Sequence, residues 1–325
     1  MQDGRMTTPA ELVAAARSGD AGAFEQLVAP YRGELIAHCY RMLGSLDDAE
    51  DAVQESLVRA WRSVGHLDDR GFVRAWLYKI ATNRCLTAIE RRGRRELPVD
   101  VDPGRPATEI NWLEPYPDPS PEARYLARES VELAFVAALQ HLSATQRAVL
   151  ILREVLGFSA AEVAVQLDTS PASVNSALQR ARAKLATLDR DVRQAPMTDE
   201  HQRSLLERYV QAWESGDLER FVALLKEDAV YAMPPWREWY RGRGSIGDFF
   251  GAVWPAYRGF RLVPVGANLQ PAFALYTLGA EGRWNAHSIQ LLSLDKDGIA
   301  TFTAFMQPLA QKLFTAFQMP TIRET

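Results

Sequence analysis

The chain has 325 residues, which is long enough for two or three domains. Hydrophobic residues make up 47% of it and charged residues 24%, values typical of a folded globular protein and not of a disordered one. The formal net charge of −4 argues against a protein that binds nucleic acid over its whole surface.

Targeting signals and cofactor motifs are missing from the sequence. No apolar run reaches the roughly 18 residues of a membrane span, and the first residues do not resemble a signal peptide. Cys39 and Cys85 are far apart and belong to no CxxC or histidine cluster, so neither a disulfide framework nor a zinc site is expected. We therefore expect a cytoplasmic protein with no metal, no cofactor and no membrane contact.

Residues 9–95 have the apolar spacing of packed helices and form the first predicted domain. Within it, the carboxylates Asp47, Asp48, Glu50, Asp51 and Glu55 follow one another with no base between them. Residues 72–95 contain seven Lys or Arg and a single acid. A protein whose charges are sorted in this way presents different surfaces to different partners.

Residues 96–127 are predicted to be a largely extended linker. Seven of the chain's 18 prolines lie between Pro98 and Pro121. The stretch from Trp112 to Asp118, WLEPYPD, interrupts this polar segment with aromatic and apolar residues. Such an island suggests docking onto some surface, for which the protein's own C-terminal domain is one candidate; a casual loop contact is the alternative.

Residues 128–193 are predicted to contain a helix-turn-helix. A first helix over residues 145–156 ends at Gly157, and Ser159 with Glu162 forms the capping box of a second helix. Ser170 caps a third helix, in which Pro171 occupies the first position. An ordinary helical hairpin with a solvated face is the alternative.

The third helix has one apolar and one polar face. Val174, Leu178, Ala181 and Leu185 share the apolar face. Short polar side chains followed by bases occupy the other face, which suits entry into the major groove and contact with phosphates. The candidates for base contacts are Ser173, Ser176, Gln179 and Arg180, and those for phosphate are Arg182 and Lys184.

Residues 197–325 are predicted to form an α+β domain. Two amphipathic helices come first, and strands are expected over residues 229–233, 260–266, 272–278, 286–294 and 299–305. Asp297-Gly298 is a hairpin signal between the last two strands. Helices followed by an antiparallel run imply a curved sheet.

An enzyme on such a fold needs a positioned acid–base pair, for which Asp228, Tyr231 and His287 are the candidates. Nothing in their spacing indicates a dyad, and a core histidine is the simpler interpretation of His287. A pocket lined by Met233, Trp236, Trp239, Trp284 and Phe302 is conceivable, although aromatic residues at such positions usually pack in a core. We expect a regulatory, non-catalytic domain.

The motifs together resemble a known family. The segment DAEDAVQESL from Asp48 to Leu57 and the basic helix from Phe72 to Arg92 are similar to region 2 of the extracytoplasmic-function (ECF) sigma factors. The helix-turn-helix resembles their region 4, in the right order along the chain. Tyr231 to Pro235 (YAMPP) and Trp239 to Arg243 (WYRGR) resemble the SnoaL-like cone-shaped fold, which some sigma factors of this family carry as an extension.

This resemblance implies a mostly α N-terminal half of two helical sigma domains, followed by the α+β SnoaL-like domain. Its partners would be promoter DNA and core RNA polymerase, contacted at the β′ clamp and the β flap. The implied core-binding residues are Asp48, Glu50, Asp51, Gln54 and Glu55. The implied −10 contacts are Trp76, Lys79, Asn83, Arg84, Arg91 and Arg92, although Trp76 is equally suited to the core. The six polar residues of the third helix would contact the −35 element.

Two loops depart from the pattern of the family. Asn268-Leu269-Gln270 stands where Asn-Gly-Gln is expected, and Gln318 stands where a glycine would follow Phe317. The resemblance implies a sigma factor whose C-terminal domain is a built-in regulator that contacts the linker or the sigma domains. The alternatives are a helix-turn-helix repressor or activator with a ligand-sensing domain, and a bifunctional isomerase or cyclase.

Overall fold

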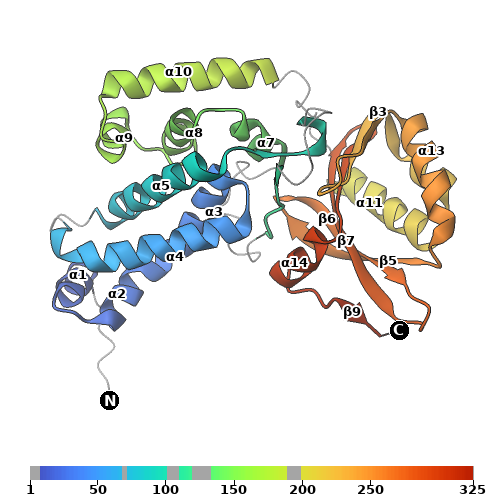
Figure 1. The fold of residues 1–325 in the computed structure, drawn as a ribbon, viewed down its shortest axis with the longest axis horizontal. Coiled ribbons are helices and arrows are strands. Elements are labelled where there is room, and N and C mark those ends of the chain that lie inside the picture. Colours follow the sequence, from blue (N-terminus) through green and yellow to red (C-terminus); the bar gives the residue numbers. More distant parts are fainter. Residues whose placement is uncertain (1–7, 68–71, 101–109, 119–132, 189–198, 325) are drawn as a thin grey trace. The chain divides into compact units, whose positions relative to one another are not determined.

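The computed structural model describes residues 8–67, 72–100, 110–118, 133–188 and 199–324. They form two compact units (Figure 1). The helical unit combines the chain up to Arg94 with Phe135–Arg190, and the second unit combines Arg95–Ala134 with the chain from Asp191 onward. Among the described helices, none is both long enough and apolar enough to cross a membrane.

The helical unit begins with five α-helices, which lie within residues 9–92. They are α1 (Pro9–Arg17), α2 (Ala21–Val28), α3 (Arg32–Leu43), α4 (Leu46–Ser63) and α5 (Val73–Arg92), with short 3₁₀ turns at η1 (Ala29–Tyr31) and η2 (Val64–His66). Side-chain caps start several of them, because the first backbone N–H groups of a helix need acceptors. Thr8 caps α1, Asp20 caps α2 and Ser45 caps α4.

The buried contact between α3 and α5 includes a polar pair. His38 Nε2 and Thr82 Oγ1 lie 2.9 Å apart, and both side chains are fully buried. Burial lowers the pKa of His38 to about 3, so the ring is neutral at physiological pH. Cys39 and Cys85 are buried free cysteines on the same two helices, as expected for small core residues.

The rest of the helical unit contains the predicted helix-turn-helix. This second part of the unit consists of α7 (Leu133–Gln140), α8 (Ala144–Leu150), the π-helix η5 (Ile151–Val155), α9 (Ala160–Gln166) and α10 (Pro171–Leu188). The single α-helix expected over residues 145–156 was wrong in its second half. There the Leu156 N–H donates to the Ile151 carbonyl, which widens the last turn. The turn at Gly157 is confirmed, with φ +75°.

The second unit contains two helices, then a sheet and further helices around it. The helices are α11 (Asp199–Glu214), α12 (Leu218–Ala223), α13 (Arg243–Val253) and α14 (Leu309–Ala316), with the 3₁₀ turn η7 (Trp254–Ala256). The strands are β3 (Leu225–Ala232), β4 (Trp239–Arg241), β5 (Phe260–Ala267), β6 (Gln270–Leu278), β7 (Trp284–Asp295), β8 (Gly298–Phe305) and β9 (Ile322–Arg323). The linker adds β1 (Arg95–Glu96), η3 (Pro98–Asp100) and β2 (Asn111–Trp112).

The main sheet has the strand order β4-β3-β8-β7-β6-β5, and β9 pairs with β7. The five predicted strands are confirmed within a few residues, and Asp295 pairs with Gly298 across the predicted β7–β8 hairpin. The expectation of a purely antiparallel run was wrong at one place, because β3 pairs with β8 in parallel. The chain leaves β3 through β4 and α13, completes the β5–β8 meander and returns beside β3 in the same direction.

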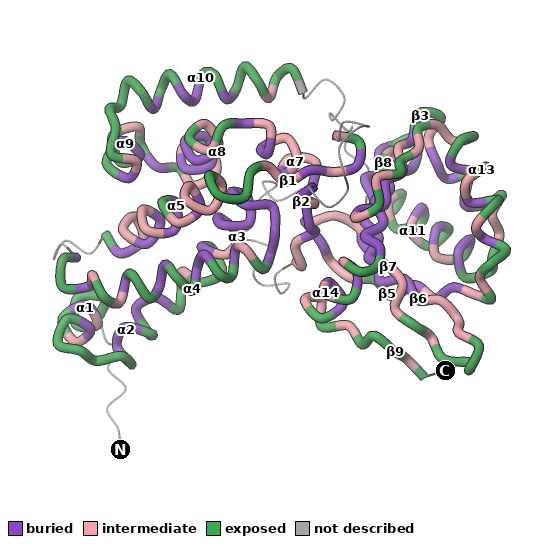
Figure 2. The backbone as a smooth tube through the Cα atoms, viewed as in Figure 1, coloured by how far each residue is buried: buried purple, intermediate pink, exposed green. Residues whose placement is uncertain are grey.

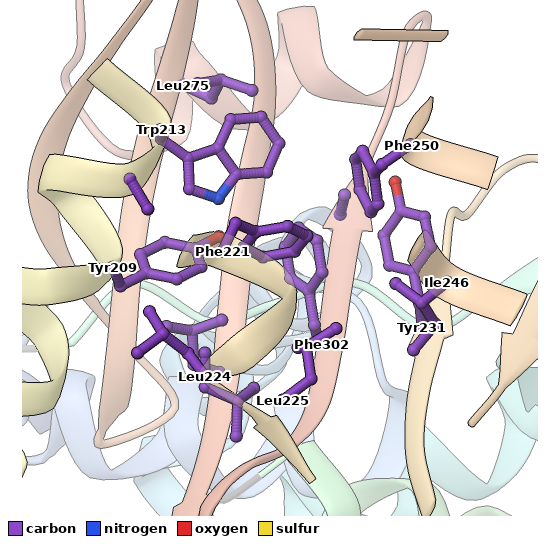
Figure 3. Packing of buried hydrophobic residues seen from close by; sticks show 14 of the residues in the cluster. Tyr209, Trp213, Phe221, Leu224, Leu225, Tyr231, Ile246, Phe250, Leu275 and Phe302 are labelled. Atoms are coloured by element: carbon purple, nitrogen blue, oxygen red, sulfur yellow. The ribbon is translucent and has the colours of Figure 1, made fainter. Parts of the chain in front are cut away.

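An aromatic core fills the space between this sheet and helices α11 to α13 (Figure 3). Trp213 of α11 lies at its centre, with ring centroids 5.3 Å from Phe221 and 4.6 Å from Trp254. Tyr231 of β3 stacks on Phe302 of β8 at 4.6 Å. Aromatic pairs in these geometries stabilise a core beyond the effect of the area that they bury. The space between the sheet and these helices is therefore occupied by the protein's own side chains.

Gly298 provides a test of this fold. Its φ of +135° is strained for any other residue, and a Cβ there would lie 2.6 Å from the Leu224 carbonyl oxygen. We expect Gly298→Ala to lower the free energy of unfolding of the second unit by about 1–3 kcal/mol. Urea denaturation followed by tryptophan fluorescence would measure it.

Gly244→Ala is the matched control, because Gly244 lies in α13 with open space around its Cβ position. Alanine is the better helix former, so this variant should be unchanged or more stable. Equal destabilisation of both variants would contradict the assigned role of Gly298.

Candidate nucleic-acid interface

The exposed face of α10 is the first part of the candidate interface. All six residues predicted to contact the −35 element, Ser173, Ser176, Gln179, Arg180, Arg182 and Lys184, are exposed. Val174, Leu178 and Ala181 are buried on the opposite face, as expected, whereas Leu185 is only half-buried. In Figure 2, most of α10 is exposed, with buried positions in between. The helix can therefore present its polar face to a groove without loss of packing.

Local hydrogen bonds fix the start of each helix in this motif. The Glu162 N–H donates to Ser159 Oγ at 3.2 Å, and the Ser159 N–H donates to Glu162 Oε2 at 2.7 Å, which confirms the predicted capping box. The side-chain and backbone hydrogen bonds from Ser159 lower the pKa of Glu162. The Ser173 N–H donates to Ser170 Oγ at 3.2 Å, which confirms the cap of α10.

Arg182 is the one member of this set of six for which the structure gives an ion pair. Its Nε donates to Glu154 Oε1 of η5 at 2.6 Å. Binding of Arg182 to phosphate would require exchange of this carboxylate for a phosphate oxygen. Ser173, Ser176, Gln179 and Arg180 project from the two turns N-terminal to Arg182, where direct base contacts are made in helix-turn-helix proteins.

The predicted −10 residues are distributed over more than one side of α5. Asn83, Arg91 and Arg92 are exposed, and Trp76 and Lys79 are half-buried. The Arg84 side chain is only 15% exposed. The six residues therefore do not share one equally open surface.

Ion pairs join the basic helix to the acidic helix. Arg84 pairs with Glu55, and Arg92 pairs with Asp48. Because α4 and α5 pack against each other, residues about two turns apart on one helix meet residues about two turns apart on the other. Two residues of the predicted acidic surface are thus paired with two residues of the predicted basic surface.

The remaining core-binding candidates are open. Glu50, Asp51 and Gln54 are exposed on α4, whereas its residues Ala49, Ala52 and Val53 are buried. A carboxylate that lies in solvent is available for an ion pair with a partner protein without the loss of an internal contact. This three-residue patch is the part of the acidic helix best placed for docking.

The linker island lies against the β5–β6 turn of the second unit. The Tyr116 N–H donates to Asn268 Oδ1 at 2.8 Å, and the Asn268 N–H donates to the Tyr116 carbonyl at 2.8 Å. Asp118 Oδ1 accepts from the Leu269 N–H at 2.6 Å, and Pro117 forms a β-bridge with Ala267. The island is therefore held by backbone pairing to the domain that was its predicted candidate.

Buried and charged groups extend this contact. Leu113 is fully buried, and Glu114 is 5% exposed. Lys312 Nζ of α14 donates to Glu114 Oε1 at 2.9 Å, and Arg95 Nη1 lies 3.6 Å from the same oxygen. Further along the chain, the Leu133 N–H donates to Gln270 Oε1 at 2.9 Å. The linker island and Leu133, at the start of α7, thus both contact residues of the sheet or of α14 in this unit.

The two departures from the family pattern both have left-handed backbone. Leu269 has φ +57° and Gln318 has φ +55°, a region that favours glycine. The β5–β6 turn nevertheless keeps its contact with the linker, because it uses the Leu269 N–H and not its side chain.

The candidate catalytic residues are not brought together. Asp228 is exposed beside Lys226, and Tyr231 is buried within the aromatic core. His287 Nε2 lies 3.0 Å from the Tyr257 hydroxyl, and burial lowers the pKa of His287 to about 4. The prediction of a pocket was partly wrong. A groove of about 540 Å³ is lined by the predicted Met233 and Trp236 together with Pro235, Arg237, Glu238 and Phe249. Phe302 instead belongs to the core.

The sequence patterns did not predict the roles of two residues in the helical unit. Arg147 of α8 is 2% exposed and donates to the Met42 carbonyl of α3, and Asp168 in the turn before α10 pairs with Lys79 of α5. Asp168 has φ +49°, which aspartate tolerates better than most residues. An Arg inside an apolar helix was the available signal for the first, whereas nothing in the sequence indicated the second.

Comparisons with known proteins agree with this organisation. The family model "Sigma-70 region 2" matches residues 27–95, "Sigma-70, region 4" matches residues 132–185, and "SnoaL-like domain" matches residues 206–309. The ECF RNA polymerase sigma factor SigG of Mycobacterium tuberculosis is 43% identical over 319 residues, which cover 92% of this chain and 84% of SigG. SigM of the same organism is 30% identical over 179 residues, which cover 55% of this chain and 83% of SigM.

A solved structure has the same fold. The crystal structure of the M. tuberculosis extracytoplasmic-function sigma factor SigJ matches with a TM-score of 0.62 and 23% identity, and the match covers 90% of this chain and 99% of that one. With regions 2 and 4 in order, a SnoaL-like domain after them and a relative matched over most of its length, the chain belongs to the ECF RNA polymerase sigma factors, which direct transcription initiation at promoters.

Proposed function

We propose that the protein binds core RNA polymerase through α4 and contacts promoter DNA through α5 and α10. The division of α10 into a buried apolar face and an exposed face with all six predicted −35 residues carries this proposal. The polymerase contacts would lie on the β′ clamp, for α4, and on the β flap, for region 4. Glu50, Asp51 and Gln54 are the residues of α4 that support it, because they are exposed.

The charge distribution supports a function that requires polymerase. The affinity of a protein for DNA rises with the number of phosphates that its Lys and Arg side chains neutralise. On this chain, carboxylates already neutralise Arg84, Arg92 and Arg182. The isolated protein should therefore bind duplex DNA weakly. Attachment to polymerase would compensate by holding α5 and α10 near the promoter at a high effective concentration.

We further propose that the C-terminal domain is a built-in regulator that acts through the linker. The linker is the only covalent connection between region 2 and region 4, and its island pairs with the β5–β6 turn. A linker held in this way has fewer conformations, which limits the separations that regions 2 and 4 can adopt. Release of the linker should therefore favour the extended arrangement that two promoter elements require.

Run-off transcription tests the first proposal. Purified full-length protein would be mixed with sigma-free core polymerase and a panel of promoter fragments. We expect core binding and promoter-specific transcripts. Duplex binding by the protein alone, without core binding, would favour a free-standing repressor or activator instead.

Charge reversal on α4 should separate docking from folding. Asp51 is exposed, so Asp51→Lys should weaken binding to core polymerase by about tenfold, as expected for loss of one or two charge contacts at an interface. The melting temperature should stay within about 1–2 °C of the wild-type value, because surface substitutions rarely change stability much. Affinity would be measured by fluorescence anisotropy with labelled protein.

Glu219→Lys is the matched control, since Glu219 is an exposed acid in the first turn of α12 of the other unit. It should leave core affinity unchanged. A large fall in the melting temperature of Asp51→Lys would instead assign this acid a structural role.

Asn268→Gly should release the linker island. Glycine adopts the φ of +55° found at this position, and the substitution removes the side-chain amide whose oxygen accepts from the Tyr116 N–H. Loss of one partner of a partly buried hydrogen bond costs about 1–3 kcal/mol. We expect hydrogen exchange across residues 110–118 to become about tenfold faster, and run-off transcription to increase.

Leu269→Gly is the control for this experiment. It relieves the left-handed strain at Leu269 and keeps the N–H that donates to Asp118. Exchange in the island should then be unchanged or slower. Faster exchange in Asn268→Gly with unaltered transcription would mean that docking of the linker does not regulate initiation.

A further inference from the structure

The loop between β3 and β4, together with α13, encloses a groove in the second unit. Its volume of about 540 Å³ is within the range of binding sites for small organic ligands. The lining includes Met233, which is 1% exposed, half-buried Phe249 of α13, and Trp236, which is 45% exposed. A ligand that enters from solvent therefore meets an apolar and aromatic surface.

Backbone hydrogen bonds fix the loop that carries most of this lining. The Trp236 N–H donates to the Met233 carbonyl at 2.7 Å, which closes a turn. The Met306 N–H, just after β8, donates to the Pro234 carbonyl at 2.7 Å. Such a site needs little ordering when a ligand binds, which reduces the entropy cost of binding.

The aromatic core behind the groove confines a ligand to the groove itself. Tyr231 stacks on Phe302 with centroids 4.6 Å apart, and Phe250 lies 5.0 Å from Tyr231 (Figure 3). A ligand could enter the space between the sheet and the helices only by displacing these buried rings. The groove at the β3–β4 loop is therefore the better candidate for a ligand site in this domain.

Two opposite charges complete the lining. Arg237 and Glu238 follow Trp236 directly in the chain, and both line the groove. Burial, and secondly the negative charge of Glu238, raise the pKa of Tyr240, so this carboxylate lies near the ring that packs on Phe249 at 4.6 Å. Arginine binds carboxylates through its fork of N–H groups, and glutamate accepts from ammonium groups.

This arrangement of charges restricts the class of ligand. An uncharged ligand would remove water from both charged groups without replacing its hydrogen bonds, and a ligand with one charge would compensate only one of them. Because Arg237 and Glu238 are consecutive residues, the two ligand groups that they bind must also lie close together. An ammonium and a carboxylate on the same carbon atom meet this requirement.

We propose that this groove binds a small zwitterion with an aromatic side chain, of which an aromatic α-amino acid is the simplest example. Its carboxylate would bind to Arg237 and its ammonium to Glu238. Its ring would pack against Trp236 and Phe249, with Met233 beneath it. The site is independent of the proposed function in transcription, since binding can be measured without polymerase or DNA.

L-Phenylalanine is the probe, and isothermal titration calorimetry on the full-length protein is the measurement. A ligand of about 12 non-hydrogen atoms that binds with ordinary efficiency has a Kd of roughly 1–2 mM. Phenylpropanoate lacks the ammonium, and phenethylamine lacks the carboxylate. Contacts between partly exposed charges contribute up to about fivefold, so each analogue should bind about two- to fivefold more weakly than L-phenylalanine.

Trp236→Ala tests the aromatic part of the site. Loss of the indole ring should weaken binding of L-phenylalanine by about fivefold or more. Trp239→Ala is the matched control, because Trp239 of β4 is 39% exposed and lies outside the groove lining. It should bind L-phenylalanine as the wild type does. Both tryptophans are exposed, so neither variant should change the melting temperature by more than about 2 °C.

Arg237→Gln and Glu238→Gln assign the two charges. Without the guanidinium, L-phenylalanine and phenethylamine should bind alike. Without the carboxylate, L-phenylalanine and phenylpropanoate should bind alike. Each variant is expected to retain the preference that depends on the other charge.

Three results would overturn the proposal. The first is the absence of saturable binding of L-phenylalanine at about ten times the expected Kd. The second is equal binding of either analogue and L-phenylalanine to the wild type, and the third is equal loss of affinity in Trp236→Ala and Trp239→Ala. A protein that binds L-phenylalanine as expected but not core polymerase would contradict the proposed function and support this site.

Discussion

Arg147 lies where the two sigma regions of the helical unit meet, and the arrangement of that unit depends on it. Its guanidinium is almost wholly buried and donates to the Met42 carbonyl oxygen of α3 in region 2 and to the side-chain and backbone oxygens of Gln140 in region 4. Removal of one partner of a buried charge costs far more than an exposed ion pair contributes. Arg147 therefore fixes the position of α8 on region 2. The exposed Lys79–Asp168 pair contributes much less to the position of α9 on α5.

Polar contacts also hold the linker on the second unit. The described part of the linker contacts this unit through backbone pairs and an ion pair, and its Leu113 is fully buried. Glu114, the acid of this ion pair, is nearly buried and lies between Arg95 and Lys312. Protein–protein contacts that must open and close are commonly polar in this way, because their separated surfaces stay soluble.

Local signals in the sequence predicted most of the fold. Ser159 and Glu162 lie three residues apart, so their capping box was visible without any tertiary information. The strand β4 and helix α14 could not be predicted, since β4 has three residues and α14 has eight, too few for a clear period. The pairs Arg84–Glu55 and Lys79–Asp168 join residues 29 and 89 positions apart, so they follow only from how the helices pack. The predicted DNA and polymerase surfaces were therefore drawn as separate, whereas the structure links them.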